Sequence, residues 1–491
     1  SQITRTSRLK GPVMSKFLNF YKTSAPSETK VAAAESDKVY KKLRFQSFVA
    51  GTLGYSLYYV CRTSLNVMKQ PIIDSGFLDA AQLGVIGSCL LFAYAIGKFV
   101  NGFLADHSNI KRFMATGLLI SALCNFLMGA LGFWDGAASA TGIGMFLAFA
   151  VIWAISGWSQ SMGSPPAIIA LSRWYPISQR GTFYGFFSAS HNIGEWLSFL
   201  FVGLVVAAFG WQWGFFGSAT AGIIGVFIIV FFMHDTPESK GLAPVEILAG
   251  EMTEEEYAEA QAKKQAEAAA DKANKDEVTS LQKKVLLNPG VWIIALSSAF
   301  MYISRYAING WGTLFLQKVK GFELSEATFL ISINALCGIF GTVLSGWFSD
   351  KVFKGDRRYP ALLFGALNSV ALALFLYGGN SWALNVLAMI LFGTAIGVLI
   401  CFLGGLMAVD LVPRKASGAA LGVVGMASYA AAGIQDIVSG VLIDKNITTE
   451  MVNGVAEQVY DFGPAIIFWI AASVVSFVLP LFNWKKTKVN R

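Results

Sequence analysis

The chain has 491 residues, of which 55% are hydrophobic and only 14% are charged. A soluble globular protein carries roughly 25% charged residues, so this composition excludes a chain whose surface faces mainly water, and it is too apolar for a disordered or fibrous protein. The net charge of +8 would permit binding to nucleic acid, but the distribution of the positive residues argues against that interpretation. We expect lipid to surround most of the chain.

Twelve apolar runs are long enough to cross a bilayer, which takes about 20 helical residues. They predict an all-α membrane protein with twelve transmembrane helices. In chain order the predicted spans cover residues 45–68, 82–104, 113–134, 141–171, 181–209, 211–234, 290–317, 327–348, 359–378, 382–409, 416–444 and 463–484.

Lysine and arginine are distributed very unequally between the two sets of connecting segments. With the N-terminus inside, the cytoplasmic segments hold 31 of these residues, and the opposite side holds four, at Lys69, Lys318, Lys320 and Lys445. Positive residues accumulate on the cytoplasmic side of membrane proteins. The count therefore predicts a multi-pass protein with both termini in the cytoplasm, and it explains the positive charge without nucleic acid.

The spans and their connections divide the chain into five parts. We expect a cytoplasmic N-terminal segment (1–44), an N-terminal six-helix bundle (45–234), a cytoplasmic linker (235–289), a C-terminal six-helix bundle (290–484) and a cytoplasmic tail (485–491). Within the linker, three glutamates at 254–256 precede an Ala-, Gln- and Lys-rich stretch. This pattern predicts an exposed helix with an acidic start and a basic end.

No pattern of catalytic or metal-binding residues is visible. The five cysteines lie in apolar stretches without CxxC spacing, which favours small buried side chains over disulfides or metal ligands. His107 and His234 lie at loop edges, and there is no HExxH motif. We therefore expect neither an enzyme nor a protein with a metal or cofactor.

An internal repeat relates the two halves of the chain. The motif GFLADHSNIKRF begins at Gly102, after the second span, and GWFSDKVFKGDRR begins at Gly346, after the eighth, 244 residues later. Arg62 and Arg305 are 243 residues apart, so they occupy equivalent positions in the first and seventh spans. Two six-helix halves related by an axis along the membrane normal would place these arginines opposite one another across a central cavity.

A charged side chain inside a membrane span is costly, roughly 2.5–3.5 kcal/mol on insertion scales, and it usually has a function. Three positive residues lie within the predicted spans: Arg62, Lys98 and Arg305. The guanidinium group can donate bidentate hydrogen bonds to the oxygens of phosphate or carboxylate, which favours an anionic substrate. Two alternatives remain, which are extension of the side chain to the membrane surface and pairing with Glu195 or Asp436.

Other polar side chains accompany these charges within the spans. Tyrosines can bind phosphate oxygens or sugar faces, although ordinary helix packing is an equal alternative for each of them. His191 could contact a ligand or carry a proton, or it could simply pair with Glu195, one helical turn later. The accompanying residues are Tyr55, Tyr58 and Tyr59 near Arg62, Tyr302 and Tyr306 near Arg305, Tyr94 one turn before Lys98, and His191 with Asn192 in the fifth span.

The ensemble of motifs resembles the organophosphate:phosphate antiporter family of the major facilitator superfamily. The resemblance runs from about Phe45 to Phe482. The motifs that carry it are GYSLYYVCR (54–62), AYAIGKF (93–99), GWSQSMGSPP (157–166), SASHNIG (188–194), VLLNPGVW (285–292), YISRYAINGWG (302–312) and GWFSDKVFKGDRR (346–358). It implies the major facilitator fold, with two six-helix halves that alternate access to a central site.

The resemblance also implies which residues bind the substrate. Arg62 and Arg305 match the paired arginines that bind the phosphoryl group in this family. Eight further residues match positions that line the family's substrate pathway: Lys98, Tyr55, Tyr59, Tyr94, Gln160, His191, Tyr302 and Tyr429. The chain departs from the family pattern at Thr63, where lysine is usual, and at Gly310 and Asn334, where acids are frequent.

By this resemblance, the expected activity is exchange of an external organic phosphate ester, of the hexose-6-phosphate or glycerol-3-phosphate type, for internal inorganic phosphate. The expected location is the inner (cytoplasmic) membrane. One alternative is a receptor that does not transport but senses an external sugar phosphate and signals through a partner protein. Another is a proton-coupled anion symporter driven by Glu195 or Asp436.

Overall fold

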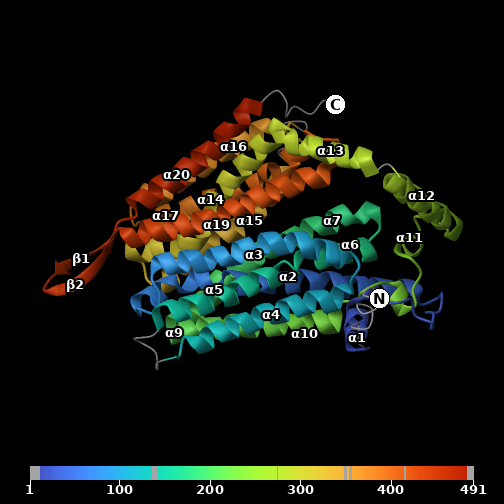
Figure 1. Ribbon diagram of the computed structural model, residues 1–491, viewed down its shortest axis with the longest axis horizontal. Helices are drawn as coiled ribbons and strands as arrows, with labels where there is room; N and C mark the ends of the chain where they lie inside the picture. The colour runs from blue at the N-terminus through green and yellow to red at the C-terminus, as the bar shows by residue number, and fades with distance from the viewer. Residues whose placement is uncertain are drawn as a thin grey trace, which may run out of the picture.

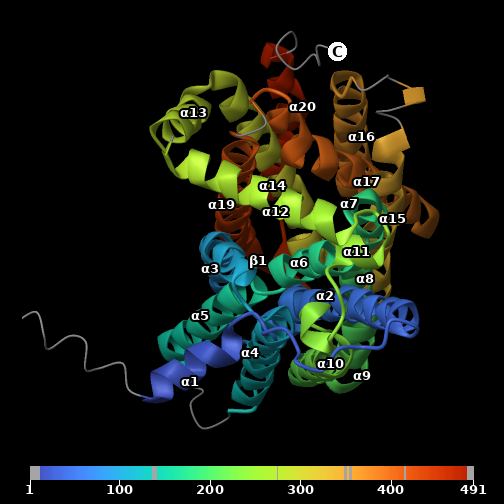
Figure 2. The ribbon, with the colours of Figure 1, turned by 90° about the vertical axis from the view of Figure 1, so that its right-hand side faces the viewer.

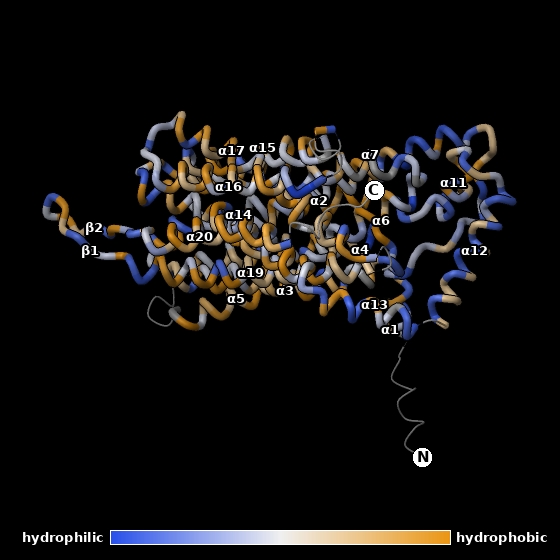
Figure 3. Tube along the Cα trace, turned by 90° about the horizontal axis from the view of Figure 1, so that it is seen from above, coloured by the Kyte–Doolittle hydropathy of each residue, from blue (hydrophilic) through white to orange (hydrophobic). Residues whose placement is uncertain are grey.

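A computed structural model describes residues 12–483, except 135–140, 274, 348–350, 353–355, 414 and 415. The predicted tail (485–491) and the aspartate of the second repeat motif, Asp350, lie outside the described residues. Long helices run side by side along the longest axis of the molecule (Figure 1). Their middle parts form an apolar band, and the polar residues gather toward the two ends, as expected of helices that cross a bilayer (Figure 3).

The N-terminal half contains six membrane-crossing segments, two of which are made of several helices. They are α2 (Ser36–Asp74), α3 (Ala80–Asp106), α4 (Ile110–Leu131), α5 (Thr141–Gln160) with α6 (Ser164–Trp174), the series α7 (Ile177–Ser188), α8 (Ser190–Leu197), η1 (Ser198–Val202) and α9 (Gly203–Phe209), and α10 (Trp211–Phe232). Gly210 separates α9 from α10 with a φ of +101°, a left-handed conformation that glycine adopts without steric cost.

The C-terminal half repeats this arrangement with six further segments. They are α14 (Pro289–Lys318), α15 (Leu324–Trp347), α16 (Arg358–Tyr377), α17 (Trp382–Cys401) with η4 (Phe402–Leu406) and α18 (Met407–Val409), α19 (Ser417–Lys445), and α20 (Gly463–Val478) with η6 (Leu479–Asn483). Viewed along the bundle axis, most helices of the two halves lie in two separate groups (Figure 2). This is the predicted all-α membrane fold of twelve helices in two six-helix halves.

Eleven helical stretches are long and apolar enough to cross a membrane by composition alone, among the residues that the structure describes. The twelfth segment is α2, which is 39 residues long but carries many polar residues along its length. Its buried residues include four tyrosines, an arginine and a lysine. The first span is therefore less apolar because it contributes many polar side chains to the interior of the protein.

Smaller elements lie outside the twelve spans. Helices α1 (Pro12–Tyr21), α11 (Val245–Leu248), α12 (Glu254–Ala273) and α13 (Lys275–Leu287) lie at one end of the bundle, which we call the terminal side. Helix α12 confirms the exposed helix predicted in the linker, and none of its residues is buried.

A β-hairpin that the sequence analysis did not predict projects from the opposite end, which we call the hairpin side (Figure 1). It consists of β1 (Ile447–Val452) and β2 (Val455–Tyr460), paired so that Val452 faces Val455. Asn453 and Gly454 form its turn with φ values of +53° and +81°. An Asn-Gly pair between β-forming residues is a strong hairpin signal, and it was present in the sequence.

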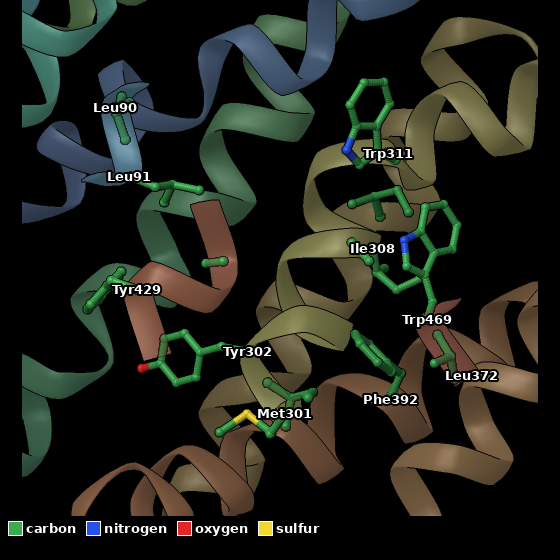
Figure 4. Close-up of a cluster of buried hydrophobic side chains, with 14 of the residues drawn as sticks. Leu90, Leu91, Met301, Tyr302, Ile308, Trp311, Leu372, Phe392, Tyr429 and Trp469 are labelled. Carbon is green, nitrogen blue, oxygen red and sulfur yellow. The ribbon is translucent and has the colours of Figure 1, made fainter. Parts of the chain in front are cut away.

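The apolar core continues across the C-terminal half and up to its contact with the other half. Ile308 and Trp311 of α14 belong to a cluster that also contains Phe392 of α17 and Trp469 of α20 (Figure 4). Tyr302 and Tyr429 lie at another edge of the same cluster, beside Leu91 of α3 (Figure 4). The packing of α14 therefore holds its arginine-bearing face toward the N-terminal half.

His234 follows α10 and lies outside the membrane-spanning helices. Its Nε2 lies 2.9 Å from Gln46 Oε1. Burial, together with the positive charges of Lys240, Lys111 and Lys42, lowers the pKa of His234 to about 4. This side chain is therefore buried in its neutral form, and protonation disfavours the folded state.

We expect the folded protein to lose stability as the pH falls from about 6.5 to about 4. The unfolded chain takes up a proton on His234 near pH 6.5, whereas the folded chain does so only near pH 4, so the free energy of unfolding decreases by up to about 3 kcal/mol over this range. Thermal unfolding of the detergent-solubilised protein measures the effect. His234→Gln should flatten the pH dependence, and His107→Gln, at an exposed position, is the matched control. If stability fell equally with pH in both variants and in the parent, the result would show that His234 does not cause the pH dependence.

Candidate substrate-binding site

Arg62 lies in the middle of α2 and is 6% exposed. Its Nε donates a hydrogen bond to Gln160 Oε1 at 3.1 Å, and Gln160 in turn donates to Ser121 Oγ at 2.9 Å. The guanidinium group lies over the rings of Tyr59 and Tyr94, at 4.1 and 4.3 Å from their centres. Its Nη1 and Nη2 atoms are buried and have no hydrogen-bond partner among the described residues. The Nε hydrogen bond and the faces of the two tyrosine rings thus orient Arg62. Its two terminal nitrogens have no hydrogen-bond partner among the described residues.

Arg305 lies at the equivalent place on α14 and is 5% exposed. Among the described residues Arg305, unlike Arg62, forms an ion pair, because its Nη2 lies 3.6 Å from Glu195 Oε1 of α8. Tyr302 and Tyr306 flank the guanidinium group at 5.5 and 5.3 Å. Of the alternatives left open by the sequence, pairing with an acid therefore holds for Arg305. Glu195 contacts this arginine across the two halves.

Tyrosine rings connect the two arginines across the interface between the halves. Tyr94 of α3 packs edge-on against Tyr429 of α19, with ring centres 4.8 Å apart. Tyr429 also contacts Tyr302 at 5.5 Å and Tyr306 at 6.4 Å. A continuous aromatic wall therefore runs from Arg62 to Arg305.

The remaining predicted residues lie around this wall. Lys98 Nζ lies 5.3 Å from the ring centre of Tyr429. The His191 ring lies 5.7 Å from Tyr59, and Tyr55 packs against Tyr59 at 5.4 Å. Together with Gln160, all ten residues predicted to bind the substrate thus form one connected cluster.

Tyr58 follows the packing alternative instead. Its hydroxyl group donates to the backbone oxygens of Met114 and Met162, and its side chain is fully buried. The three neighbouring tyrosines of α2 thus divide between two roles, because Tyr55 and Tyr59 lie one helical turn apart on one face.

The charges of the cluster do not cancel. Arg62, Arg305 and Lys98 contribute three positive charges, and Glu195 contributes one negative charge. Without counting His191, two positive charges remain, and the two arginines are buried, where uncompensated charge is costly, whereas Lys98 is exposed. This arrangement favours a bound anion with two negative charges.

A second group of charged residues lies two helical turns from Arg62, toward the hairpin side. Lys69 is 1% exposed; its Nζ lies 3.8 Å from Asp436 Oδ1 and donates to the Gly310 backbone oxygen at 2.7 Å. Trp311 donates from Nε1 to the same carboxylate at 2.9 Å, and Lys69 Nζ lies 3.7 Å from the ring centre of Trp311. This buried cluster joins α2 of one half to α14 and α19 of the other.

The placement of Lys69 corrects the sequence analysis, which assigned this lysine to a loop on the outer side. Helix α2 continues past residue 68 and through Pro71 to Asp74. A lysine at the end of an apolar run normally marks the end of a span. Here Asp436, which lies 367 residues later in the chain, compensates its charge. The available signal was the seven-residue spacing from Arg62, which places both side chains on one helix face.

Two further contacts between the halves follow Lys69 along α2. Gln70 contacts Gln317, and Asp74 accepts from Lys318 Nζ at 2.7 Å. We call these two contacts and the Lys69–Asp436 pair the hairpin-side latch.

Helices α3 and α19 pack tightly on the same side. A Cβ atom on Gly84 or Gly87 would collide with Asp436, and one on Gly433 would collide with Phe92. Toward the terminal side, Gly102 of α3 and Gly422 of α19 have open space around them. Helices α3 and α19 are therefore in close contact on the hairpin side, whereas both helices carry glycines with free space beside them toward the terminal side.

Residues 51–435 match the model of the Major Facilitator Superfamily. The chain therefore belongs to this superfamily of membrane transporters and is not an enzyme. The fold agrees with a solved structure of a bacterial homologue of the human lysosomal transporter Spinster in an inward-facing conformation, with a TM-score of 0.66 at 19% identity over 91% of this chain and 97% of that one.

Similar proteins of known type indicate the branch of the superfamily to which the chain is related. The chain is 32% identical to a probable hexose phosphate transport protein of Chlamydia pneumoniae, over 92% of this chain and 94% of the relative. It is 31% identical to the glycerol-3-phosphate transporter of Bacillus subtilis, over 96% and 99% of the two chains. It is also 30% identical to the membrane sensor protein UhpC of Salmonella typhimurium, over 85% and 89%. These relatives confirm the predicted resemblance to the organophosphate antiporters.

Proposed function

We propose that this protein takes up an organic phosphate ester in exchange for inorganic phosphate. The observation that carries the proposal is that Nη1 and Nη2 of Arg62 are buried without a hydrogen-bond partner in the part of the chain that the structure describes. A buried guanidinium group without acceptors costs free energy, and a phosphoryl group supplies two acceptors in the matching geometry. The relatives named as hexose phosphate and glycerol-3-phosphate transporters support this class of ester.

The charge of the site supports a dianionic ligand. Phosphate monoesters lose their second proton near pH 6, so they carry close to two negative charges at neutral pH. Inorganic phosphate carries a similar charge, so both ligands of the exchange would neutralise the two positive charges left by Arg62, Arg305, Lys98 and Glu195.

Exchange follows from the same electrostatics. The bundles formed by residues 45–234 and 290–484 each contribute one arginine. With a dianion between them, closure of both halves satisfies both guanidinium groups. Without an anion, the occluded state would hold the excess positive charge in a dry site, so the empty carrier returns slowly. Inorganic phosphate enables the return step.

We place the terminal side in the cytoplasm and the protein in the inner membrane. The sequence assigns 31 lysine and arginine residues to the segments predicted to be cytoplasmic and, without the buried Lys69, three to the opposite side (Lys318, Lys320 and Lys445), which supports this orientation. The linker 235–289 and both chain ends would then be cytoplasmic, and the hairpin-side latch would close the external entrance.

Exchange in proteoliposomes tests the proposal. Vesicles loaded with phosphate are offered labelled glucose-6-phosphate, glycerol-3-phosphate or phosphoglycerate, and vesicles without internal phosphate are the control. We expect uptake of at least one ester that requires internal phosphate. Uptake that ignores internal phosphate and collapses with the pH gradient would instead establish a proton symporter driven by Glu195 or Asp436.

The relative named as a membrane sensor favours a second candidate, a receptor for external sugar phosphate that signals to a partner protein. The same arginine site would serve both functions. Tight binding of the ester to the purified protein, without measurable counterflow in the vesicles, would establish the receptor and reject the exchanger.

The charge argument predicts discrimination between phosphate and sulfate esters. A sulfate monoester has a similar shape but carries only one negative charge. We expect it to compete with the phosphate ester at least about tenfold more weakly, because one pocket charge remains uncompensated. Inhibition of phosphate-ester uptake by glucose-6-sulfate and glucose-6-phosphate measures the ratio. Equal inhibition by both compounds would show that the second negative charge is not recognised.

A further inference from the structure

Helix α1 has two different faces. Successive residues of an α-helix are separated by 100°, which places Val13, Met14, Phe17 and Leu18 together on one side. The opposite side carries Ser15, Lys16 and Asn19. The part of the chain that the structure describes leaves the apolar side open, since Val13 is 79% and Phe17 is 58% exposed. An apolar surface of this kind on a short helix requires an apolar environment.

The helix lies across the ends of the membrane-crossing helices instead of running parallel to them (Figure 1). Viewed along the bundle axis, it lies at the periphery beside α4 and points away from the interface between the two halves (Figure 2). It is therefore oriented in the plane of the membrane, outside the substrate pathway.

Contacts at the C-terminal end of α1 set its depth. The Tyr21 hydroxyl group lies 2.8 Å from Thr116 Oγ1, and Arg112 Nη1 donates to the Phe20 backbone oxygen at 2.9 Å. Thr116 lies six residues into α4, about 9 Å below its first residue. The C-terminal end of α1 is thus held at the level where a transmembrane helix enters the bilayer.

The apolar face of α1 continues the lipid-facing surface of α4. Leu119, Leu123 and Leu127 are exposed on α4, and they follow Thr116 at intervals of three and four residues. These positions share one helix face, so the Tyr21–Thr116 contact joins α1 to the stripe that faces the acyl chains.

Basic residues gather beside the same helix. Lys16 and Lys22 are exposed, and Arg112 and Lys240 are each near enough to Lys111 for their positive charges to repel it. Basic residues next to an apolar helix at the membrane surface match the negatively charged headgroups of phospholipids.

We propose that α1 is an interfacial anchor, with its apolar face in the acyl-chain boundary of the terminal-side leaflet and its basic neighbours on anionic phospholipid headgroups. The anchor goes beyond the transport function and does not depend on it. It fixes the N-terminal segment, whose residues 20–24 contact Ser108, Asn109 and Arg112 at the start of α4 and Asp235 after α10.

Nitroxide labels on the full-length protein in nanodiscs test the proposal. Phe17→Cys places a label on the apolar face, and Asn19→Cys is the matched control on the polar face; the unsubstituted protein measures background labelling of the native cysteines. We expect the ratio of collisions with oxygen to collisions with a water-soluble nickel chelate to be several-fold higher at position 17. High nickel accessibility at both positions would overturn the anchor, and low accessibility to both reagents at position 17 would indicate a protein partner instead.

Lipid composition tests the charge component. In nanodiscs with phosphatidylglycerol, the label at position 17 should be mainly immobilised, and phosphatidylcholine alone should increase the mobile fraction. Lys16→Ser and Lys22→Ser should each shift the ratio of the two fractions about fivefold toward the mobile form. Ratios that do not change with lipid charge or with either substitution would reject the recognition of anionic headgroups.

Discussion

Replacing Arg62 with lysine is expected to lower kcat/KM for phosphate-ester exchange by about 100-fold. Lysine keeps the positive charge, but its ammonium group cannot offer the two parallel N–H groups of Nη1 and Nη2. It also loses the Nε hydrogen bond to Gln160 and the guanidinium contacts with the rings of Tyr59 and Tyr94. Initial rates in proteoliposomes measure the effect. Exchange by Arg62→Lys as fast as by the parent would show that Arg62 does not bind the phosphoryl group.

Substitution of Arg305, the arginine of the other half, should affect exchange differently from the same substitution of Arg62. Arg305→Gln leaves the Glu195 carboxylate unpaired beside the substrate, so we expect a larger loss than for Arg62→Gln. Glu195→Gln added to Arg305→Gln should recover part of the binding, because it removes the stranded negative charge. The same second change added to Arg62→Gln is the matched control. If Glu195→Gln changed substrate binding equally in the Arg305→Gln and Arg62→Gln proteins, the result would argue against an ion pair specific to Arg305 and Glu195.

Breaking the hairpin-side latch is expected to shift the protein toward the state that is open on the hairpin side. Lys69→Met strands the buried Asp436 carboxylate, and loss of one partner of a buried pair costs about 3–5 kcal/mol. Water entering between the halves relieves this cost. A cysteine at Asn66, which lines the cavity between Arg62 and the latch, should then react faster with an impermeant maleimide from the hairpin side.

The controls separate the latch from general damage. Ser75→Cys, exposed at the end of α2, should be labelled equally in all backgrounds. Combining Lys69→Met with Asp436→Leu removes both charges and should restore slow labelling at Asn66→Cys. Labelling that is equally slow in the parent and in Lys69→Met would contradict a role for this pair in closure.

Several predictions from the sequence depended only on spacing and residue type. The apolar runs predicted all twelve spans, because the length of a membrane crossing is set by the bilayer. The 243-residue interval placed Arg62 and Arg305 at equivalent positions, since an internal repeat preserves geometry. Apolar runs do not predict the β-hairpin, because it lies between two spans and its signal is the local pair Asn453 and Gly454.

Spacing and residue type did not predict which oppositely charged residue each buried charge would pair with. Glu195 could have paired with His191, one turn away, but it contacts Arg305 in the other half. Lys69 was assigned to a loop, whereas Asp436 and Trp311 surround it in the folded chain. Such contacts depend on which helix faces meet across the interface, and no local pattern encodes that.

The sequence by itself determined that this chain lies in lipid, crosses it twelve times and carries a matched pair of arginines. Only the tertiary structure decided that the two arginines are unequal. Arg305 has an acid beside it, whereas the terminal nitrogens of Arg62 are buried without a partner among the described residues. The reason is physical: the cost of a buried charge depends on its neighbours in space, and these come from helices far apart in the chain.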